Sequence, residues 1–453
     1  MLKSAFSLDF FQDLSLSEKI HRILHISLDS VNPTSVVNNF VKTDGNDLVI
    51  NGSCFKLKNI NSIIVIGFGK ASQKMALGLK MALKEIQMRG VIICKHDQSD
   101  ITNHLLPEIT TLIGDHPIPG DTSLNATKAI IKLITHRRSN ELVICLISGG
   151  GSSLFTNPSE NLSLSSLQEL TGLLIKSGAP IQEINTVRKH LDAVKGGGLV
   201  KLIYPNQLLA LIISDVIGDT LSMIASGPTA EDPTTFNDAL RVIQKYGLEK
   251  KVDKVIVDTL KDGLLGKIEE SLKPGDYRMK RVHNFIIGNN RIATLAGRDQ
   301  AIKEGFYCEV ISNHLSGEAR EVGRYLGRIL IKVKNEFKYP LCLIAGGEST
   351  VTVKGKGKGG RNQEVALAAA LEIAGMEKTC FLTLATDGED GNTDAAGAVV
   401  TGSTVKIAHS MGINPKSFLE QNNCYEFFRR VGGMIKTGPT GTNVNDLYFL
   451  FVY

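Results

Sequence analysis

The stretch SIIVIGFGKAS, residues 62–72, decides the fold class of this chain. A run of β-branched residues ends in two glycines, Gly67 and Gly69, and the chain then enters a helix-like stretch from Ser72. A strand followed by a tight turn and an amphipathic helix is the repeating unit of α/β proteins. The stretch therefore predicts an α/β fold.

The same unit recurs along the chain, and each apolar run is followed by a loop of small or polar residues. The runs ELVICLIS, LLALIIS, LCLIAG and FLTLAT begin at residues 141, 208, 341 and 381. Another run, HNFIIG at 283–288, is followed by a helix-like stretch and by YCEVIS at 307–312, which predicts a complete β-α-β unit. Because continuous apolar strands alternating with helices indicate parallel sheets, we expect two Rossmann-like domains with mostly parallel sheets and an active-site cleft between them.

The domain boundary is expected where these loops are missing. The stretch from Asn237 to Arg281 is polar and helical in pattern. We therefore expect an N-terminal α/β domain over 1–245, a helical connection over 246–280 and a C-terminal α/β domain over 281–453. An amphipathic helix within Leu16–Val37 is expected to pack on the first domain.

Bulk properties exclude several classes of protein. A net charge of +5 is too weak for wrapping nucleic acid but suits anionic small substrates. The seven cysteines form no C-x-x-C pair, which indicates buried thiols in a reducing compartment. The first twenty residues carry acids and no long apolar segment, which favours the cytoplasm over a mitochondrial location. No apolar run reaches membrane-spanning length, so no membrane partner is expected.

The loop at residues 148–153 is the first candidate for phosphate binding. In parallel sheets ligands bind beyond the carboxyl ends of the strands, and this loop follows the apolar run ELVICLI. Its glycines and hydroxyls suit a phosphate cradle, although a flexible turn is the alternative and the order is not that of a Walker loop. The residues concerned are Ser148, Gly149, Gly150, Gly151, Ser152 and Ser153.

The turn with Gly67 and Gly69 carries Lys70, our first catalytic candidate. A lysine in the first turn of a helix opposes the helix dipole, so a bound phosphate or carboxylate would explain it. A dinucleotide fingerprint would have a third glycine where Ser72 stands and an acid where Lys95 stands. The turn therefore supports dinucleotide binding only weakly.

Two further segments of the first half carry substrate and metal candidates. Arg188 and Lys195 lie just before a triple glycine and suit an anionic substrate, although a plain helix end would look the same. Asp215 ends a strand-like run and is the candidate ligand for Mg²⁺, with a turn role as the alternative. Asn289, directly after HNFIIG, is a further candidate substrate contact.

The second half adds the stretch AGGESTVTVKGKGKGGRNQE, residues 345–364. Gly346, Gly347 and Glu348 are candidate ATP contacts, and a flexible basic loop then leads into a helix opened by Arg361. A guanidinium there could bind an oxyanion through two hydrogen bonds, so Arg361 is the second catalytic candidate. Asp387, first beyond the run FLTLAT, is a candidate for substrate or metal binding or for a simple turn.

Several of these motifs, taken together, carry a family resemblance. GFGKAS, ISGGGSSL, INTVRKHLDAVKGGGL, ISDVIGD, IASGPT, GGESTVTVKGKGKGGRNQE and TDGEDGNTDAAGA follow one another over nearly the whole chain. In this order they resemble the class II glycerate kinase family, whose C-terminal half is called the MOFRL domain. The lysine of the family's Gly-x-Gly-Lys turn falls on Lys70, and the arginine of its Gly-Gly-Arg-Asn motif falls on Arg361.

The resemblance implies a function for the chain. A family member transfers a phosphate from ATP to D-glycerate with Mg²⁺, usually giving 2-phosphoglycerate. Lys70 and Arg361 would then stabilise the transferring phosphoryl group from opposite domains. Proteins of this family also carry the label hydroxypyruvate reductase, so an NAD(P)-dependent reductase and a non-catalytic binding protein stay open as alternatives. The expected partners are ATP and D-glycerate without nucleic acid or membrane, and a homodimer stays open as the assembly.

Overall fold

The computed structural model describes residues 14–45, 47–57, 60, 62–84, 86–95, 106–337 and 340–453. The targeting prediction for the first residues falls largely on residues 1–13, which lie outside the described ones. The chain forms two compact units. One comprises residues 33–287, and the other combines residues 1–32 with residues 288–453. In the described part of the chain, no helix has the length and apolar character to cross a bilayer.

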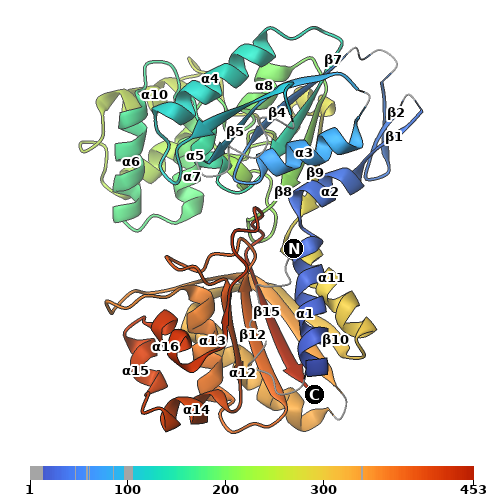
Figure 1. The fold of residues 1–453 in the computed structure, drawn as a ribbon. Coiled ribbons are helices and arrows are strands. Elements are labelled where there is room, and N and C mark those ends of the chain that lie inside the picture. Colours follow the sequence, from blue (N-terminus) through green and yellow to red (C-terminus); the bar gives the residue numbers. More distant parts are fainter. Residues whose placement is uncertain are drawn as a thin grey trace. The chain divides into compact units, whose positions relative to one another are not determined.

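The unit of residues 33–287 is built on a six-stranded sheet with the order β6-β5-β4-β7-β8-β9 (Figure 1). The pairs β5–β6, β4–β5, β4–β7 and β7–β8 are all parallel. The inner strands β4, β7 and β8 are apolar and buried along nearly their whole length, as expected of a sheet that helices cover on both faces. The strands are β4 (Ser62–Phe68), β5 (Met88–Lys95), β6 (Ile109–Gly114), β7 (Glu141–Ile147), β8 (Leu208–Ile213) and β9 (Val282–Gly288).

The covering helices of this sheet are amphipathic. One core cluster joins alternate residues of the strands, such as Ile64 and Ile66, to apolar residues of α4 and α8. Helix α3 packs on β4, β5 and β7, and α2 packs on α3. The helices are α2 (Pro33–Phe40), α3 (Ser72–Ala82), α4 (Asp121–Thr135), α5 (Gly151–Leu154) and α8 (Gly198–Ile203). A small antiparallel sheet of β1 (Val41–Asp44), β2 (Asp47–Ile50) and β3 (Ser53–Lys56) follows α2.

A separate helical cluster completes this unit. Its apolar core joins α6 (Leu164–Lys176), α7 (Ile181–His190), α9 (Phe236–Lys245) and α10 (Lys254–Leu264). The predicted helical connection over 246–280 therefore packs into the first unit, because α10 buries its apolar face against α9. Strand β9 also belongs to this unit, so the chain crosses to the other unit at Gly288 and not near 281.

The second unit holds a mixed six-stranded sheet with the order β10-β11-β15-β12-β13-β14. Strands β10 and β11 are parallel, and β15 runs antiparallel between β11 and β12. The prediction of mostly parallel sheets therefore holds for the first sheet, whereas the second is mixed. The strands are β10 (Tyr307–Glu318), β11 (Leu341–Thr350), β12 (Thr379–Ala385), β13 (Gly397–Thr401), β14 (Met434–Ile435) and β15 (Asp446–Val452).

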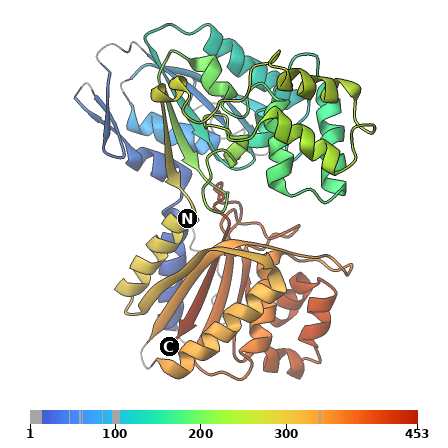
Figure 2. The same cartoon turned by 180° about the vertical axis from the view of Figure 1, so that it is seen from behind.

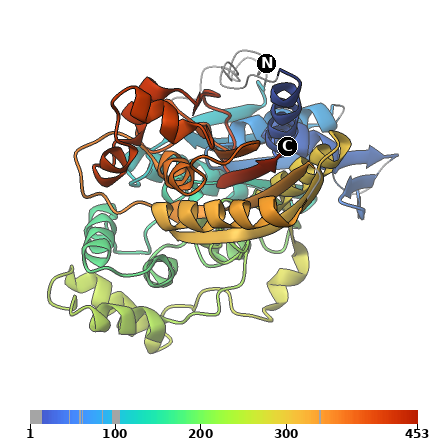
Figure 3. The ribbon, with the colours of Figure 1, turned by 90° about the horizontal axis from the view of Figure 1, so that it is seen from below.

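Helices lie on both faces of the mixed sheet. On one face lie α12 (Ala319–Glu336), which crosses in front of the sheet in Figure 2, and α13 (Arg361–Glu372). These helices pack on alternate strand residues such as Leu343 and Leu450. On the other, α11 (Asn290–Lys303) carries α1 (Leu14–Asp29), and Figure 3 shows α1 and α12 on opposite sides of β15. Three short helices flank α13, namely α14 (Thr404–Ser410), α15 (Pro415–Glu420) and α16 (Cys424–Val431).

Two sequence expectations are corrected by this arrangement. HNFIIG and YCEVIS do form β9 and β10 with a helix between them, but the two strands lie in different sheets. The expected amphipathic helix is divided before Pro33, and its first part, α1, packs on α11 of the second unit instead of on the first. Both errors have one cause: periodicity identifies an element and its apolar face, but not the partner that covers this face.

Candidate active site

The predicted site residues fall into two groups, one in each unit. In the first unit, β4 and β7 are parallel neighbours, so the turn after β4 and the loop after β7 lie side by side. The Lys70 N–H donates to the Gly149 carbonyl oxygen at 2.9 Å. Gly69 has a φ of +123°, and a Cβ there would overlap the Ser148 side chain. The structure thus brings the two predicted phosphate loops together.

Hydroxyl groups hold these loops in place. Ser72, which replaces a fingerprint glycine, donates to the Gly69 carbonyl oxygen at 2.9 Å and fixes the turn. The Ser152 hydroxyl lies 2.7 Å from the hydroxyl of Ser226. Ser226 and its neighbour Ala225 have positive φ angles of 63° and 50°, which are costly for residues with a side chain. Backbone strain of this kind concentrates at functional sites.

A cavity of about 170 Å³ opens beside the glycine-rich loop. One part of its wall is polar and includes the loop itself, and another part is apolar. A cavity with a few convergent polar groups is the usual form of a small-molecule site. The lining residues are His116, Pro117, Pro119, Gly150, Ser152, Ser153, Thr156, Leu164, Leu167, Thr171, Arg188, Asp192 and Lys195.

The two predicted substrate contacts, Arg188 and Lys195, have different surroundings in this cavity. Lys195 donates to the carbonyl oxygens of Ser152 at 2.9 Å and Phe155 at 2.8 Å, so its ammonium supports the loop. For the Arg188 guanidinium, no hydrogen-bond acceptor is found among the residues that the structure describes. Burial lowers the pKa of Arg188, and the negative charge of Asp192 opposes this change. Arg188 therefore has hydrogen-bond donors at this cavity that no described protein acceptor uses.

Asp215, Lys70 and His116 also border the glycine-rich loop. A Cβ on Gly149 would overlap the Asp215 carboxylate, so this carboxylate lies against the loop backbone. A Cβ on Gly150 would lie 2.9 Å from His116 Cδ2 and 3.5 Å from Lys70 Cγ. Glycines at both positions therefore let three polar side chains approach one loop. Within the described ranges, no set of three His, Cys, Asp or Glu side chains is arranged to hold a metal ion.

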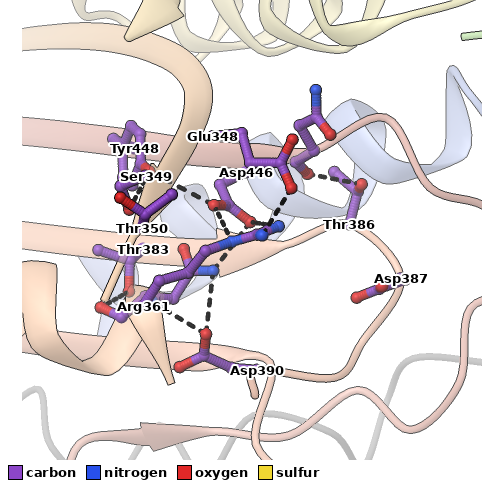
Figure 4. A network of polar contacts seen from close by, with 12 residues as sticks. Glu348, Ser349, Thr350, Arg361, Thr383, Thr386, Asp387, Asp390, Asp446 and Tyr448 are labelled. Carbon is purple, nitrogen blue, oxygen red and sulfur yellow. Dashed lines mark hydrogen bonds and ion pairs between the residues drawn. The ribbon is translucent and has the colours of Figure 1, made fainter. Parts of the chain in front are cut away.

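In the second unit, Arg361 opens α13 and is held by two carboxylates (Figure 4). Its Nε donates to Asp446 Oδ2 at 2.7 Å, and its Nη2 donates to Asp446 Oδ1 at 3.1 Å. Its Nη1 donates to Glu348 Oε1 at 2.7 Å. Burial raises the pKa of Asp446 to about 7, against the opposing effects of Arg361 and Asn362.

The topology of the mixed sheet explains why these side chains meet. Strands β11 and β12 are both antiparallel to β15, so their carboxyl ends lie at the same edge. Asp446 begins β15 at this edge, opposite Gly347 on one side and Ala385 on the other. Glu348 follows at the end of β11, and the loop before α13 returns to the same edge.

Asp390 fixes the start of α13. Its Oδ1 accepts a hydrogen bond from the Asn362 N–H at 2.9 Å, and its Oδ2 accepts one from the Gln363 N–H at 2.9 Å. The Asn362 and Gln363 side chains donate to the same carboxylate at 3.3 and 3.0 Å. Burial raises the pKa of Asp390, and these hydrogen bonds oppose that rise. The carboxylate thus satisfies amides that a helix N-terminus leaves unpaired.

Gly346 and Gly347, predicted to contact ATP, have a packing role in β11. A Cβ on Gly346 would overlap the Asn290 side chain, and a Cβ on Gly347 would overlap the Leu315 backbone. Glycine is needed there for close approach of neighbouring elements. Their contact with ATP stays a prediction.

Asn289 caps a helix, and Asp387 stabilises a turn. The Asn289 side chain accepts a hydrogen bond from the Ile292 N–H at 2.9 Å and begins α11. Asp387 Oδ1 accepts one from the Glu389 N–H at 3.1 Å. Asp387 lies near the Arg361 network at the same edge of the sheet, but its side chain is not bonded to Arg361 (Figure 4). A substrate role for either residue stays a prediction.

The basic loop before α13 is more firmly attached than the sequence suggests. The N–H groups of Lys354 and Gly355 donate to Asn422 Oδ1 at 2.7 and 2.9 Å. The N–H of Lys358 donates to Asn423 Oδ1 at 3.1 Å. The flexible loop that we expected is therefore bound along residues 421–425, because its glycines allow the two backbones to approach.

Sequence reasoning missed several residues of these two groups. His116 and Asp192 line the cavity in the first unit, and Asp390 and Asp446 hold Arg361 and its helix in the second. Asp390 stands in the acidic stretch TDGEDGNTD, which was a usable signal. Asp446 is 85 residues from Arg361 and precedes an apolar run, and no local pattern indicated it.

In the first unit a lysine turn and a glycine-rich loop meet at adjacent strand ends, and in the second unit an arginine is held at the strand ends. Groups of this kind in an α/β fold are those that a phosphotransferase needs. Two family models match the chain. Residues 19–261 match a domain of unknown function, DUF4147, and residues 341–446 match the MOFRL family.

Known proteins resemble the chain over nearly its whole length. A glycerate 2-kinase of Pyrococcus horikoshii is 40% identical over 95% of this chain and 96% of its own. A D-glycerate 2-kinase of Thermotoga maritima is 40% identical over 86% of this chain and 90% of its own. The crystal structure of a glycerate kinase from Thermotoga maritima matches with a TM-score of 0.86 and 37% identity, over 97% of this chain and all of that one. This chain belongs to the class II glycerate kinase family and carries its C-terminal MOFRL domain.

Proposed function

We propose that this protein is a glycerate kinase that transfers the γ-phosphate of ATP to D-glycerate and forms 2-phosphoglycerate and ADP. The observation that carries the proposal is the direct hydrogen bonding between the Lys70 turn and the loop of residues 148–153, beside a cavity that contains Arg188. Phosphoryl transfer asks a protein mainly for positioning and for positive charge at the transferring group. Both loops offer backbone amides for phosphate oxygens, and Lys70 supplies a charge.

Lys70 and Arg361 are the proposed catalytic residues. Among the described residues, no carboxylate pairs with the Lys70 ammonium, so its charge is available for a phosphate. We propose that both side chains stabilise the negative charge of the transferring phosphoryl group. Replacing either by methionine should lower kcat by about two to three decades, as is typical when a preorganised donor is removed.

The acceptor is assigned to the cavity in the first unit. The Arg188 guanidinium suits the carboxylate of D-glycerate, because a planar fork can bind both of its oxygens. The polar wall from Gly150 to Ser153 would then lie near the hydroxyls of the acid. The apolar wall at Leu164 and Leu167 limits the acceptor to a small molecule.

Mg²⁺ is proposed to accompany ATP, with Asp215 as its protein ligand. The ion prefers oxygen ligands and needs only one or two carboxylates when phosphates and waters complete its shell. A single carboxylate against the glycine-rich loop fits this pattern. When bound, the ion would neutralise charge on the phosphates. A cytoplasmic location and a homodimer belong to the same proposal, to be tested by cell fractionation and light scattering.

The deciding experiment combines the purified protein with ATP, Mg²⁺ and D-glycerate. ADP release that depends on glycerate, with a phosphoglycerate signal by phosphorus NMR, is the expected outcome, and the signal identifies the hydroxyl used. The competing assignment is an NAD(P)-dependent hydroxypyruvate reductase. Oxidation of the nicotinamide by hydroxypyruvate, without ADP release, would favour that assignment.

A further inference from the structure

Asp446 is a fully buried carboxylate at the start of β15 in the second unit. It is 0% exposed, whereas the side chain of its partner Arg361 is 29% exposed. Glu348, the other partner of Arg361, is 42% exposed and makes a single hydrogen bond to it. The two carboxylates therefore hold Arg361 in different ways, one from inside the protein and one from its surface.

The hydrogen bonds show which part of the guanidinium stays available. A guanidinium has five N–H groups, and Asp446 accepts two of them along the edge formed by Nε and Nη2. Glu348 accepts one from Nη1. In the described part of the chain, one N–H on Nη1 and one on Nη2 have no acceptor. Because Asp446 binds the Nε–Nη2 edge from the protein interior, the remaining N–H groups of Nη1 and Nη2 form the outer edge of the guanidinium, away from Asp446.

Asp446 is itself fixed on several sides. Its Oδ1 accepts a hydrogen bond from Asn362 Nδ2 at 2.9 Å, and the position of Asn362 is set by Asp390. Its backbone lies in β15, with Gly347 of β11 on one side and Ala385 of β12 on the other. A carboxylate on the first residue of an interior strand that is paired on both sides has little freedom to move, so it can define the direction of Arg361.

We propose that Asp446 is the positioning residue of Arg361: it fixes the Nε–Nη2 edge so that the outer N–H groups meet the transferring phosphoryl group. This inference rests on the proposed kinase function. Asp446 touches no substrate in this arrangement and acts through Arg361 alone. A bidentate pair defines a direction as well as a charge, which a lysine at position 361 could not reproduce.

The test uses the full chain and the D-glycerate-dependent release of ADP. Asp446→Asn should lower kcat about 100-fold, which is the effect expected of a misplaced catalytic group, while the KM for D-glycerate changes little. The control is Glu372→Gln, because Glu372 pairs with Arg328 at 3.3 Å near the other end of the same helix. This control should keep wild-type kcat. A near-normal kcat in Asp446→Asn would overturn the proposal.

A double variant separates positioning from a general structural role. If Asp446 acts only through Arg361, adding Asp446→Asn to Arg361→Met should cause no further loss of kcat. A further loss as large as in the single variant would overturn the proposal. Should Asp446→Asn not fold, Arg361→Lys gives an independent answer, since it keeps the charge without the fork. We expect about 100-fold lower kcat there, and near-normal turnover would contradict the proposal.

The activity of the wild-type protein separates the proposed kinase function from the proposed role of Asp446. Wild-type turnover of ATP with D-glycerate supports the proposed function, and the variants then report on Asp446. Absence of this turnover would overturn both. Wild-type turnover with an unaffected Asp446→Asn variant would overturn the positioning role alone.

Discussion

Arg188 offers the most direct residue-level test of the acceptor site. Its guanidinium lines the cavity, and burial strengthens its interaction with a bound carboxylate. Arg188→Met should raise the KM for D-glycerate roughly 10- to 100-fold, the loss expected for charge-assisted hydrogen bonds, with a smaller effect on the KM for ATP. Steady-state kinetics with each substrate in turn measure this. Arg241→Met, at an exposed position of α9, is the matched control. An unchanged KM for D-glycerate would remove Arg188 from the site.

The stability and the activity of the protein should both depend on pH through the buried carboxyl group of Asp446. Burial raises the pKa of this group to about 7, and the charged or titratable groups that act on it are Arg361, Asp390 and Tyr448; Glu348 lies beyond, on Arg361. Because folding raises the pKa of Asp446, protonation of this carboxyl group stabilises the folded state. Its contribution to the free energy of unfolding is present at low pH and is lost as the pH rises through about 7.

Activity should respond in the opposite direction, because the ionised carboxylate is the form that pairs with Arg361. We expect kcat to rise, and the melting temperature to fall, as the pH increases through about 7. Asp446→Asn should show neither trend in this range. The check is to measure kcat and the melting temperature of the wild type and of Asp446→Asn as functions of pH. Identical pH profiles for the two proteins would contradict the prediction.

From the sequence, the partly exposed cations Lys70 and Arg361 could be predicted as site residues, but the buried anions Asp446 and Asp192 could not. Lys70 and Arg361 stand in short patterns at strand ends, where their charge is unusual for the local structure. Asp446 and Asp192 are set by tertiary contacts. Thr156, for example, donates to Asp192 at 2.6 Å from a distant segment. A single sequence contains the residues of such pairs but not the information on which of them meet.

At the level of elements, the glycine-rich basic loop before α13 depends on Asn422. Its side chain accepts two hydrogen bonds from this loop and donates one to Glu364 at 2.6 Å. Asn422→Gly keeps the backbone conformation, since Asn422 has a φ of +50°, but it removes these bonds. We expect about 1–3 kcal/mol of destabilisation, because Glu364 would lose a buried partner.

Limited proteolysis would measure how firmly the loop is attached. Lys354, Lys356 and Lys358 are exposed, and trypsin should cleave after them faster in Asn422→Gly than in the wild type. Asn414→Gly serves as the control, because its side chain caps α15 and accepts a hydrogen bond from the Lys416 N–H. Equal cleavage rates in wild type and Asn422→Gly would show that the loop is held by other contacts.

Sequence patterns predicted which segments form strands, but not which strands pair with each other. The apolar runs named for their pattern are strands in the structure, including β4, β7, β8, β11 and β12. The pattern could not reveal that β15 runs antiparallel between β11 and β12. An apolar run of this length suits a parallel or an antiparallel interior strand equally well. The mixed sheet therefore followed only from the structure.

For the molecule as a whole, α1 links the start of the chain to the unit formed by its later residues. Ile23 in this helix is fully buried, and α1 packs on α11. Ile23→Ala should destabilise the protein by about 2–5 kcal/mol, as for other large-to-small changes in a core. Ile26→Ala on the same helix, at a position 37% exposed, should change stability by less than about 0.5 kcal/mol.

Hydrogen exchange would show where this destabilisation acts. Faster exchange is expected in residues 14–32 and 288–337 and in the mixed sheet, whereas the sheet of residues 33–287 should keep its protection. Uniform loss of protection over both units would instead mean that they unfold together. Either outcome can be read by mass spectrometry of the two variants and the wild type.

Strand β15 follows every other strand of its sheet in the chain, yet it lies between β11 and β12. During synthesis on the ribosome, β11 and β12 must therefore wait with unpaired edges until residues 446–452 emerge. Arg361 also lacks its inner carboxylate until then. If Arg361 is catalytic as proposed, a nascent chain halted before this point would carry the glycine-rich loops of the first unit and should still be inactive. Kinase activity is then expected only after residues 446–452 have been synthesised.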